Sequence, residues 1–151
     1  MRYFISPLVL IVLLAQLNCT SDDVEVNTFK DDVSIASLNG EWKVISFEDY
    51  GSGKVEFKTQ ENSWDKDILL TFNDNMLSGT NITNHVQGEY KYVGRRQFNV
   101  TSFATTYVNQ PEWADKFMEA MLDDDLTFKI NKTGLRIYYD KSSRSVTLTK
   151  R

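Results

Sequence analysis

The chain contains little of what most catalytic and metal-binding sites need. Among its 151 residues there is one cysteine, Cys19, and one histidine, His85. One cysteine cannot form a disulfide within the chain, and one histidine cannot build a multi-histidine metal site. Proline and glycine are also few, at two and seven residues, which excludes a collagen-like or low-complexity chain. The length then indicates one folded domain.

Positive charge is scarce as well. The chain has 17 lysines and arginines against 21 acids, a formal net charge of −4. A nucleic-acid partner is therefore not expected, because neutralising phosphates requires a basic surface. The sequence also has no glycine-rich phosphate loop, zinc-binding cysteine set or nucleophile elbow. We therefore expect no cofactor, no metal and no enzyme activity.

The first residues indicate export. Arg2 is followed by the apolar run Leu8 to Ala15, which is too short for a membrane-spanning helix, and then by Gln16-Leu17-Asn18-Cys19. This pattern resembles a bacterial lipoprotein signal, in which the cysteine is lipidated and becomes the mature amino terminus. We expect a signal peptide over residues 1–18 and a lipid on Cys19 that attaches the protein to the membrane. An ordinary secretory signal with an incidental cysteine is the alternative.

An acidic tether is expected next, over residues 19–37. Residues 20–37 contain five acids and one lysine, and they lack a sustained strand or helix period. The stretch Thr-Ser-Asp-Asp after Cys19 is similar to the acidic segment of surface-exposed lipoproteins of Bacteroidetes. The sequence thus predicts an outer-membrane lipoprotein of the bacterial envelope, facing either the periplasm or the surface.

The remainder, residues 38–151, is rich in aromatic and β-branched runs separated by short turn signals. Short connections favour antiparallel hairpins over βαβ units. The expected strands are 38–47, 54–59, 67–73, 76–80, 86–93, 96–103, 126–131, 134–140 and 145–150. One helix is expected from Pro111, with a buried stripe of Trp113, Phe117, Met118, Met121 and Leu122. The fold class is therefore α+β and mostly antiparallel β, a curled sheet or open barrel with one helix packed on it.

The order of motifs in residues 38–151 resembles the META domain, the family of HslJ-like small envelope proteins. The resemblance rests on Leu38-Asn39-Gly40-Glu41-Trp42, on the strand and turn from Leu70 to Asn81, on Gly88-Glu89-Tyr90 and on Thr105 to Asn109 before the helix. Thr80 and Asn109 occupy the two positions where many members carry cysteines. The resemblance implies a small mixed β fold without known enzyme activity, linked to heat shock, envelope stress and drug tolerance.

Several aromatic side chains are candidates for contact with a partner or ligand. Trp64 lies in the polar segment 61–66, where an exposed ring can anchor a partner, although folding back onto the sheet is the more common outcome. Tyr138 is expected opposite the inward face of its strand, where it could join Tyr90 or Tyr92 in a surface cluster. The strand pairing that would decide this is not given by the sequence.

Other candidates have plainer interpretations. His85 lies in a polar stretch expected to be a loop, and a surface residue is the better interpretation. Asp123-Asp124-Asp125 lacks the spacing of an EF-hand and is expected to end the helix. Glu41, Glu48, Asp49, Glu112 and Glu119 could supply a glycosidase-like carboxylate pair, but nothing in the sequence places two of them across a cleft.

These observations predict a lipid-anchored, non-enzymatic envelope protein. Its META-like domain would bind or stabilise another envelope component, in a stress or envelope-integrity role. The alternative is a lipocalin-like carrier of a small apolar ligand. Gly40-Glu41-Trp42 also resembles the Gly-x-Trp near the start of lipocalins, and a curled sheet can enclose such a ligand. The partner is thus an unknown envelope protein or small ligand.

Overall fold

The computed structural model describes residues 35–106 and 108–151. The predicted signal peptide, the predicted lipidation site Cys19 and most of the predicted acidic tether lie outside the described residues. The tether was expected to extend to residue 37, but a 3-10 helix, η1 (Ile35–Leu38), already begins at Ile35. Leu38 at its end is fully buried, so the folded domain begins within the segment that we assigned to the tether.

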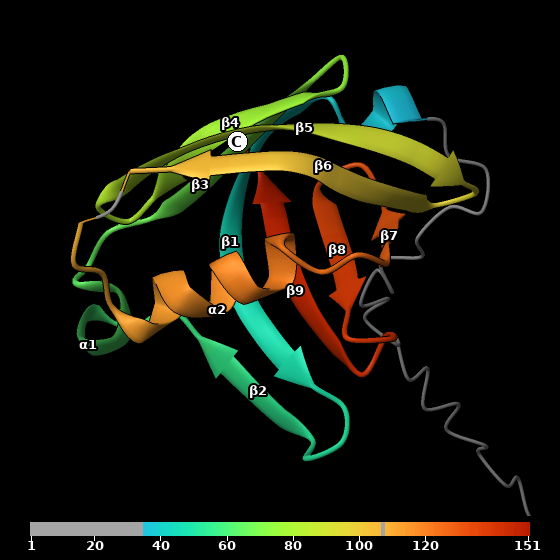
Figure 1. Ribbon diagram of the computed structural model, residues 1–151. Helices are drawn as coiled ribbons and strands as arrows, with labels where there is room; N and C mark the ends of the chain where they lie inside the picture. Colours follow the sequence, from blue (N-terminus) through green and yellow to red (C-terminus); the bar gives the residue numbers. More distant parts are fainter. Residues whose placement is uncertain (1–34, 107) are drawn as a thin grey trace, which may run out of the picture.

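Nine strands run through the described residues and form one sheet (Figure 1). They are β1 (Gly40–Asp49), β2 (Lys54–Phe57), β3 (Ile68–Asn73), β4 (Met76–Asn81), β5 (Asn84–Gly94), β6 (Gln97–Thr105), β7 (Leu126–Ile130), β8 (Gly134–Tyr139) and β9 (Arg144–Lys150). Two α-helices accompany them, α1 (Gln60–Ser63) and α2 (Glu112–Met121).

The sheet closes into a barrel. All neighbouring strands are antiparallel, in the order β2-β1-β3-β4-β5-β6-β7-β8-β9, and β9 also pairs with β1. β1 and β3 to β9 therefore form a closed ring of eight strands, while β2 extends from it as the outer strand of a hairpin with β1. The predicted antiparallel β-rich fold is confirmed, but the barrel is closed where we expected a curled sheet or open barrel. Sequence periodicity does not reveal whether the first and last strands of a sheet pair with each other.

Tight turns connect most neighbouring strands. Between β3 and β4, Asp74 and Asn75 both have positive φ, the backbone that a two-residue hairpin turn requires. Between β4 and β5 the turn is Ile82-Thr83, with Ile82 at a φ of 61°. β5 consequently begins at Asn84, and His85 is an exposed residue of this strand rather than of a loop.

Alternation along the strands fills the interior with aromatic rings. Phe72, Tyr90 and Phe98 are almost completely buried and pack edge to face, with ring centroids 5.2 to 6.0 Å apart. Phe98 also contacts Phe128 at 5.9 Å. The indole of Trp42 donates a hydrogen bond to the Leu38 carbonyl at 2.7 Å, which attaches η1 to the barrel. Large side chains thus occupy the centre of the barrel.

The predicted helix is present as α2, with Pro111 at its N-cap. Figure 1 shows α2 running across the barrel below β6, in front of β1 and β9. Its buried face consists of Trp113, Ala114, Phe117, Ala120 and Met121. Met118 is only half-buried and Leu122 is exposed, because Leu122 is the C-cap, where the helical turn has ended. The predicted stripe was therefore too wide on that side.

A second, one-turn helix was not predicted. α1 follows β2, and Thr59 caps it through a reciprocal pair of hydrogen bonds with Asn62. The turn ends at Trp64, which adopts a left-handed conformation with a φ of 51°. Among the described residues, no helix has the length and apolar character needed to cross a membrane.

Candidate functional site

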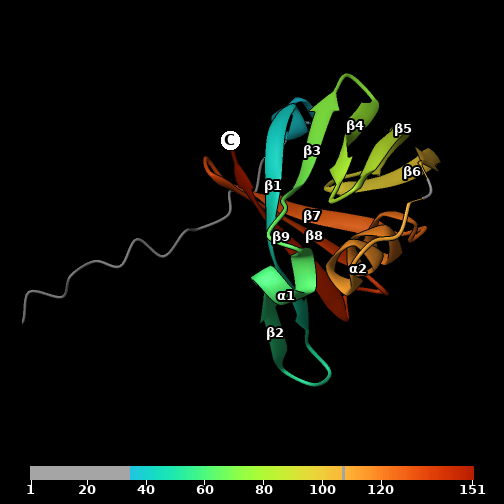
Figure 2. The ribbon, with the colours of Figure 1, turned by 90° about the vertical axis from the view of Figure 1, so that its left-hand side faces the viewer.

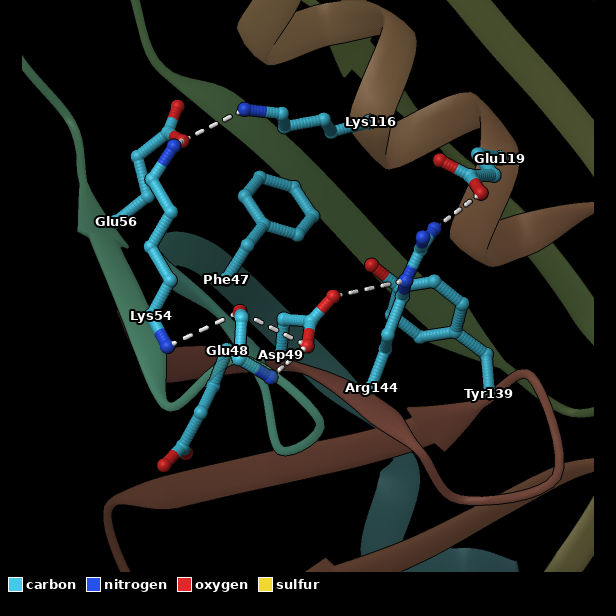
Figure 3. Close-up of a pocket in the computed structure, with 10 residues that line it drawn as sticks. Phe47, Glu48, Asp49, Lys54, Glu56, Lys116, Glu119, Tyr139 and Arg144 are labelled. Carbon is cyan, nitrogen blue, oxygen red and sulfur yellow. Dashed lines mark hydrogen bonds and ion pairs between the residues drawn. The ribbon is translucent and has the colours of Figure 1, made fainter.

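A charged cleft lies where the β1–β2 hairpin, α2 and the β8–β9 hairpin meet (Figure 3). Its volume is about 290 Å³. Four structural segments contribute its lining residues: Phe47, Glu48 and Asp49 from β1, Ser52, Lys54 and Glu56 from the β1–β2 hairpin, Lys116 and Glu119 from α2, and Tyr139 and Arg144 from the β8–β9 hairpin. The cleft therefore combines residues far apart in the sequence.

A β-bulge directs the end of β1 into the cleft. β1 pairs with β9 as Val44 with Leu148 and then Ser46 with Thr147, so Ile45 is an extra residue. The bulge changes the alternation, and Phe47 and Asp49 face the cleft. Residues opposite each other in an antiparallel pair share a face, and β2 places Glu56 opposite Phe47 and Lys54 opposite Asp49.

One side of the cleft is an ion-pair cluster centred on Lys116. Its ammonium lies 2.6 Å from Glu56 Oε2 on β2 and 2.8 Å from Glu112 Oε1, one turn earlier on α2. Lys54 lies 3.3 Å from the same Glu56 oxygen. Burial raises the pKa of the Glu56 carboxyl, but hydrogen bonds and charges from Lys116 and Lys54 outweigh burial, and the pKa is lower than its ordinary value. Glu56 therefore stays ionised at neutral pH.

The other side is centred on Arg144. Its guanidinium lies 2.6 Å from Glu119 Oε1 on α2, 3.5 Å from Asp49 Oδ2 on β1 and 3.9 Å from Asp140 Oδ2. Ser52 holds the Asp49 carboxylate through its backbone N–H at 2.8 Å and its hydroxyl at 3.0 Å. These hydrogen bonds are the main reason that the pKa of Asp49 is below its usual range.

The ring of Tyr139 lies beside Arg144, on the same side of the cleft (Figure 3). The residue is only 4% exposed, and its hydroxyl points into the cleft beside Arg144 (Figure 3). Burial raises the pKa of this phenol to about 12, so it is neutral at physiological pH and can both donate and accept a hydrogen bond. No hydrogen-bond partner for it is found in residues 35–106 and 108–151. The hydroxyl is free to bind a group that enters the cleft.

The chemistry of the cleft suits binding better than proton transfer. Asp49 and Glu119, two of the carboxylates considered for a glycosidase-like pair, do lie on different elements around the cleft, but both are paired with Arg144. A glycosidase acid needs a raised pKa, whereas the pKa values of Asp49 and Glu56 are both lowered. The only histidine, His85, lies on β5 and does not line the cleft.

None of the four predicted contact residues lines this cleft. Trp64 is 44% exposed beside α1, so its ring is available at the surface. Tyr90 is 1% exposed and lies inside the barrel against Phe72 and Phe98, which corrects its expected place in a surface cluster. Its position on β5 faces inward because the strand alternates.

The remaining two tyrosines are on the outside but apart from each other. Tyr92 is exposed at the far end of β5, and its hydroxyl accepts a hydrogen bond from the Arg96 N–H at 3.1 Å. Tyr138 is half-buried on β8, and its ring stacks on Tyr50, with centroids 6.2 Å apart and an interplanar angle of 24°. Tyr138 therefore joins Tyr50, a residue that sequence reasoning did not select.

Sequence reasoning also missed Lys116, Tyr139 and Arg144 as site residues. A signal was present for Lys116, because Glu112 and Lys116 have the i,i+4 spacing of a helical ion pair. Tyr139 was placed correctly on the inward face of its strand, but nothing indicated an opening beside it. Arg144 comes after a turn, and only the closure of β9 against β1 places it beside Asp49.

Comparisons with known proteins identify the fold alone. No family model matches the chain, and no curated protein matches it. A protein from Burkholderia xenovorans, solved by NMR, is 14% identical and covers 87% of this chain and 94% of its own, with a TM-score of 0.63. A DUF4847 family protein from Bacteroides vulgatus ATCC 8482 is 16% identical and covers 76% of this chain and 94% of its own, with a TM-score of 0.56. At these identities the shared feature is the barrel.

Proposed function

We propose that the chain is a non-enzymatic binding protein of the bacterial envelope, anchored by a lipid on Cys19. Its META-like domain would recognise a charged, polar group of another envelope component in the cleft between β1, β2, α2 and β9. The unpaired Tyr139 hydroxyl carries the proposal, because it belongs to a largely buried side chain and opens into the cleft, where a ligand can reach it.

The charges around this hydroxyl indicate what would bind. Three cations line the cleft, from Lys54, Lys116 and Arg144, and four carboxylates line it, from Glu48, Asp49, Glu56 and Glu119. A ligand with both an acidic and a basic group could bind Arg144 through its acidic group and Glu56 through its basic group, in place of their present ion-pair partners. The pairs of Arg144 with Asp49 and Glu119 are more than one-third exposed, and such pairs contribute little to stability in water, so their rearrangement costs little. The proposed recognition site therefore favours a zwitterionic small molecule or a mixed-charge protein segment.

A carrier of a small apolar ligand remains the alternative. A closed eight-stranded barrel can hold one small ligand. Here the aromatic rings of Phe72, Tyr90 and Phe98 occupy the interior, and Trp113 and Phe117 of α2 add bulk. A filled core of this kind favours recognition at the outer cleft over enclosure of an apolar molecule.

Site-specific photo-cross-linking in intact envelopes tests the proposal. A photoreactive amino acid replaces Ser52 at the cleft, and in a matched chain it replaces Ser78, which is exposed on β4 away from the cleft. We expect cross-links at position 52, reduced at least fivefold by Arg144→Gln and unchanged by Lys91→Gln, a charge loss on β5. Equal cross-linking from positions 52 and 78, or no effect of Arg144→Gln, would contradict the proposal.

A further inference from the structure

One strand of the barrel has a long unpaired edge. β6 pairs with β5 along its whole length, to Thr105, but it pairs with β7 only through Gln97 and Phe98. In residues 35–106 and 108–151, the stretch 99–105 therefore has a strand neighbour on one side only. Eight strands close the ring, but the pairing between β6 and β7 involves only two residues of each strand.

The backbone direction of this edge follows from one hydrogen bond. The N–H of Thr106 donates to the His85 carbonyl at 3.1 Å, so residue 106 faces β5. Successive residues of a strand direct their N–H and C=O groups to alternate sides. Thr105 and Phe103 therefore direct theirs away from β5, toward the unpaired side.

The edge lacks the charged residues and prolines that often prevent strand addition, and a β-bulge at Thr101 is the protecting feature that it does carry. Residues 97–106 contain no charged residue, no proline and no glycine, and they include β-formers such as Val100 and Phe103. β2, which pairs with β1 alone, is only four residues long and carries Lys54 and Glu56. β2 thus has the charges and the short length with which natural proteins protect an edge, whereas the edge of β6 is longer and carries no charge.

A groove adjoins the open edge. It has a volume of about 490 Å³ and runs between the end of β6 and α2, with Thr105 on one side and Asp115 and Met118 on the other. Its end is fixed by buried Asn84, whose amide donates to the Val108 carbonyl at 3.0 Å and to Gln110 Oε1 at 2.6 Å. The groove therefore has firm walls and room beside the edge.

We propose that an extended peptide segment of a partner protein binds here by adding a strand to β6. Main-chain hydrogen bonds to residues 99–105 would supply the affinity, and the groove would receive side chains. α2 lies below β6 in both ribbon views, so the space beside the edge suits a single slender segment better than a second barrel (Figures 1 and 2). This site shares no residue with the charged cleft, so either proposal can fail alone.

Peptide binding to the full chain in detergent tests this inference. The probes are four fluorescent heptapeptides, Thr-X-Thr-X-Thr-X-Thr, with valine, tyrosine, lysine or glutamate at X. Each has a matched version that is N-methylated at alternate residues, which removes backbone donors and keeps the side chains. We expect at least one unmodified peptide to bind at 1 mM or below, and we expect methylation to weaken it at least tenfold. When the peptide is bound, backbone amide hydrogen exchange should slow at residues 99–105 and should not change at residues 54–57.

A pair of variants locates the binding. Thr105→Pro removes an N–H that faces the open side, while Thr105→Ala keeps it, and circular dichroism checks that both fold. The proline variant should lose at least tenfold in affinity and the alanine variant should not. If no peptide binds at 1 mM, if methylated peptides bind equally well, or if protection appears only outside 99–105, the inference is wrong. Equal binding by both variants would overturn it too.

Discussion

Phe47 and Trp113 meet edge to face, with ring centroids 4.7 Å apart and an interplanar angle of 81°. The contact joins β1 to α2, both residues are buried, and Phe47 also lines the charged cleft. Trp113→Ala should therefore lower the free energy of unfolding by about 3–5 kcal/mol, since it removes a large buried ring. Denaturant unfolding of the full chain in mild detergent measures the loss.

Trp64 supplies the matched control for Trp113. Its ring is largely exposed beside α1, so Trp64→Ala should change the free energy of unfolding by less than about 1 kcal/mol. Trp113→Phe should lose less than Trp113→Ala, because it keeps a ring and removes a buried indole N–H that has no partner in the described residues. Equal losses from Trp64→Ala and Trp113→Ala would contradict the assigned packing.

Gly79 permits the close approach of two strands. A Cβ at this position on β4 would lie 1.9 Å from the Leu69 carbonyl oxygen on β3. Gly79→Ala should therefore cost more than about 2 kcal/mol, because backbone must move. Gly51→Ala is the control, since its added Cβ meets only the Asp49 carboxylate at 3.4 Å. A thermal melt in which both variants lose the same amount would show that β3 and β4 are not this close.

Acid should weaken the pairing of Lys116 with Glu56. The folded-state pKa of Glu56 is lower than its unfolded value, so its contribution is present above the unfolded pKa and is lost as pH falls through the folded pKa. The free energy of unfolding should fall between pH 6 and pH 3 in the wild type. In Lys116→Met, which lacks the pair, this fall should be smaller by up to about 1 kcal/mol. Lys91→Met, on β5, should lose as much as the wild type. An identical pH dependence for Lys116→Met and the wild type would show that the pair does not act this way.

Replacement of Cys19 tests the anchor separately from the fold. Cys19→Ser should move the protein from the membrane fraction to the soluble fraction, because a serine cannot carry the proposed thioether-linked lipid. Fractionation followed by immunodetection measures the shift, and the far-UV spectrum should remain unchanged. A membrane-bound Cys19→Ser variant would rule out lipidation as the attachment.

Local signals predicted most elements of the barrel. Alternation located the strands to within a few residues, and the spacing of Trp113, Phe117 and Met121 located α2. The closure of β9 against β1 was not predicted, because hairpin signals report only neighbouring strands. The bulge at Ile45 was also unpredictable, although it is what turns Phe47 and Asp49 toward the cleft.

The candidate site was less accessible to sequence reasoning. Conspicuous aromatics drew attention to Trp64 and Tyr90, but one caps a short helix and the other fills the core. The cleft depends on pairs such as Arg144 with Glu119, which are 25 positions apart and meet only after the sheet closes. Charge at such positions looks like ordinary solvated surface in a sequence.

The most direct measurement is native mass spectrometry of the full chain extracted from bacterial envelopes in mild detergent, combined with cross-linking from position 52. A bound zwitterionic molecule, or a cross-linked partner with a mixed-charge segment, should be present in the wild type and in Lys91→Gln. It should be lost in Arg144→Gln and weakened in Tyr139→Phe. An apolar adduct that survives both cleft substitutions, or cross-links indifferent to them, would contradict recognition at the cleft and favour a carrier.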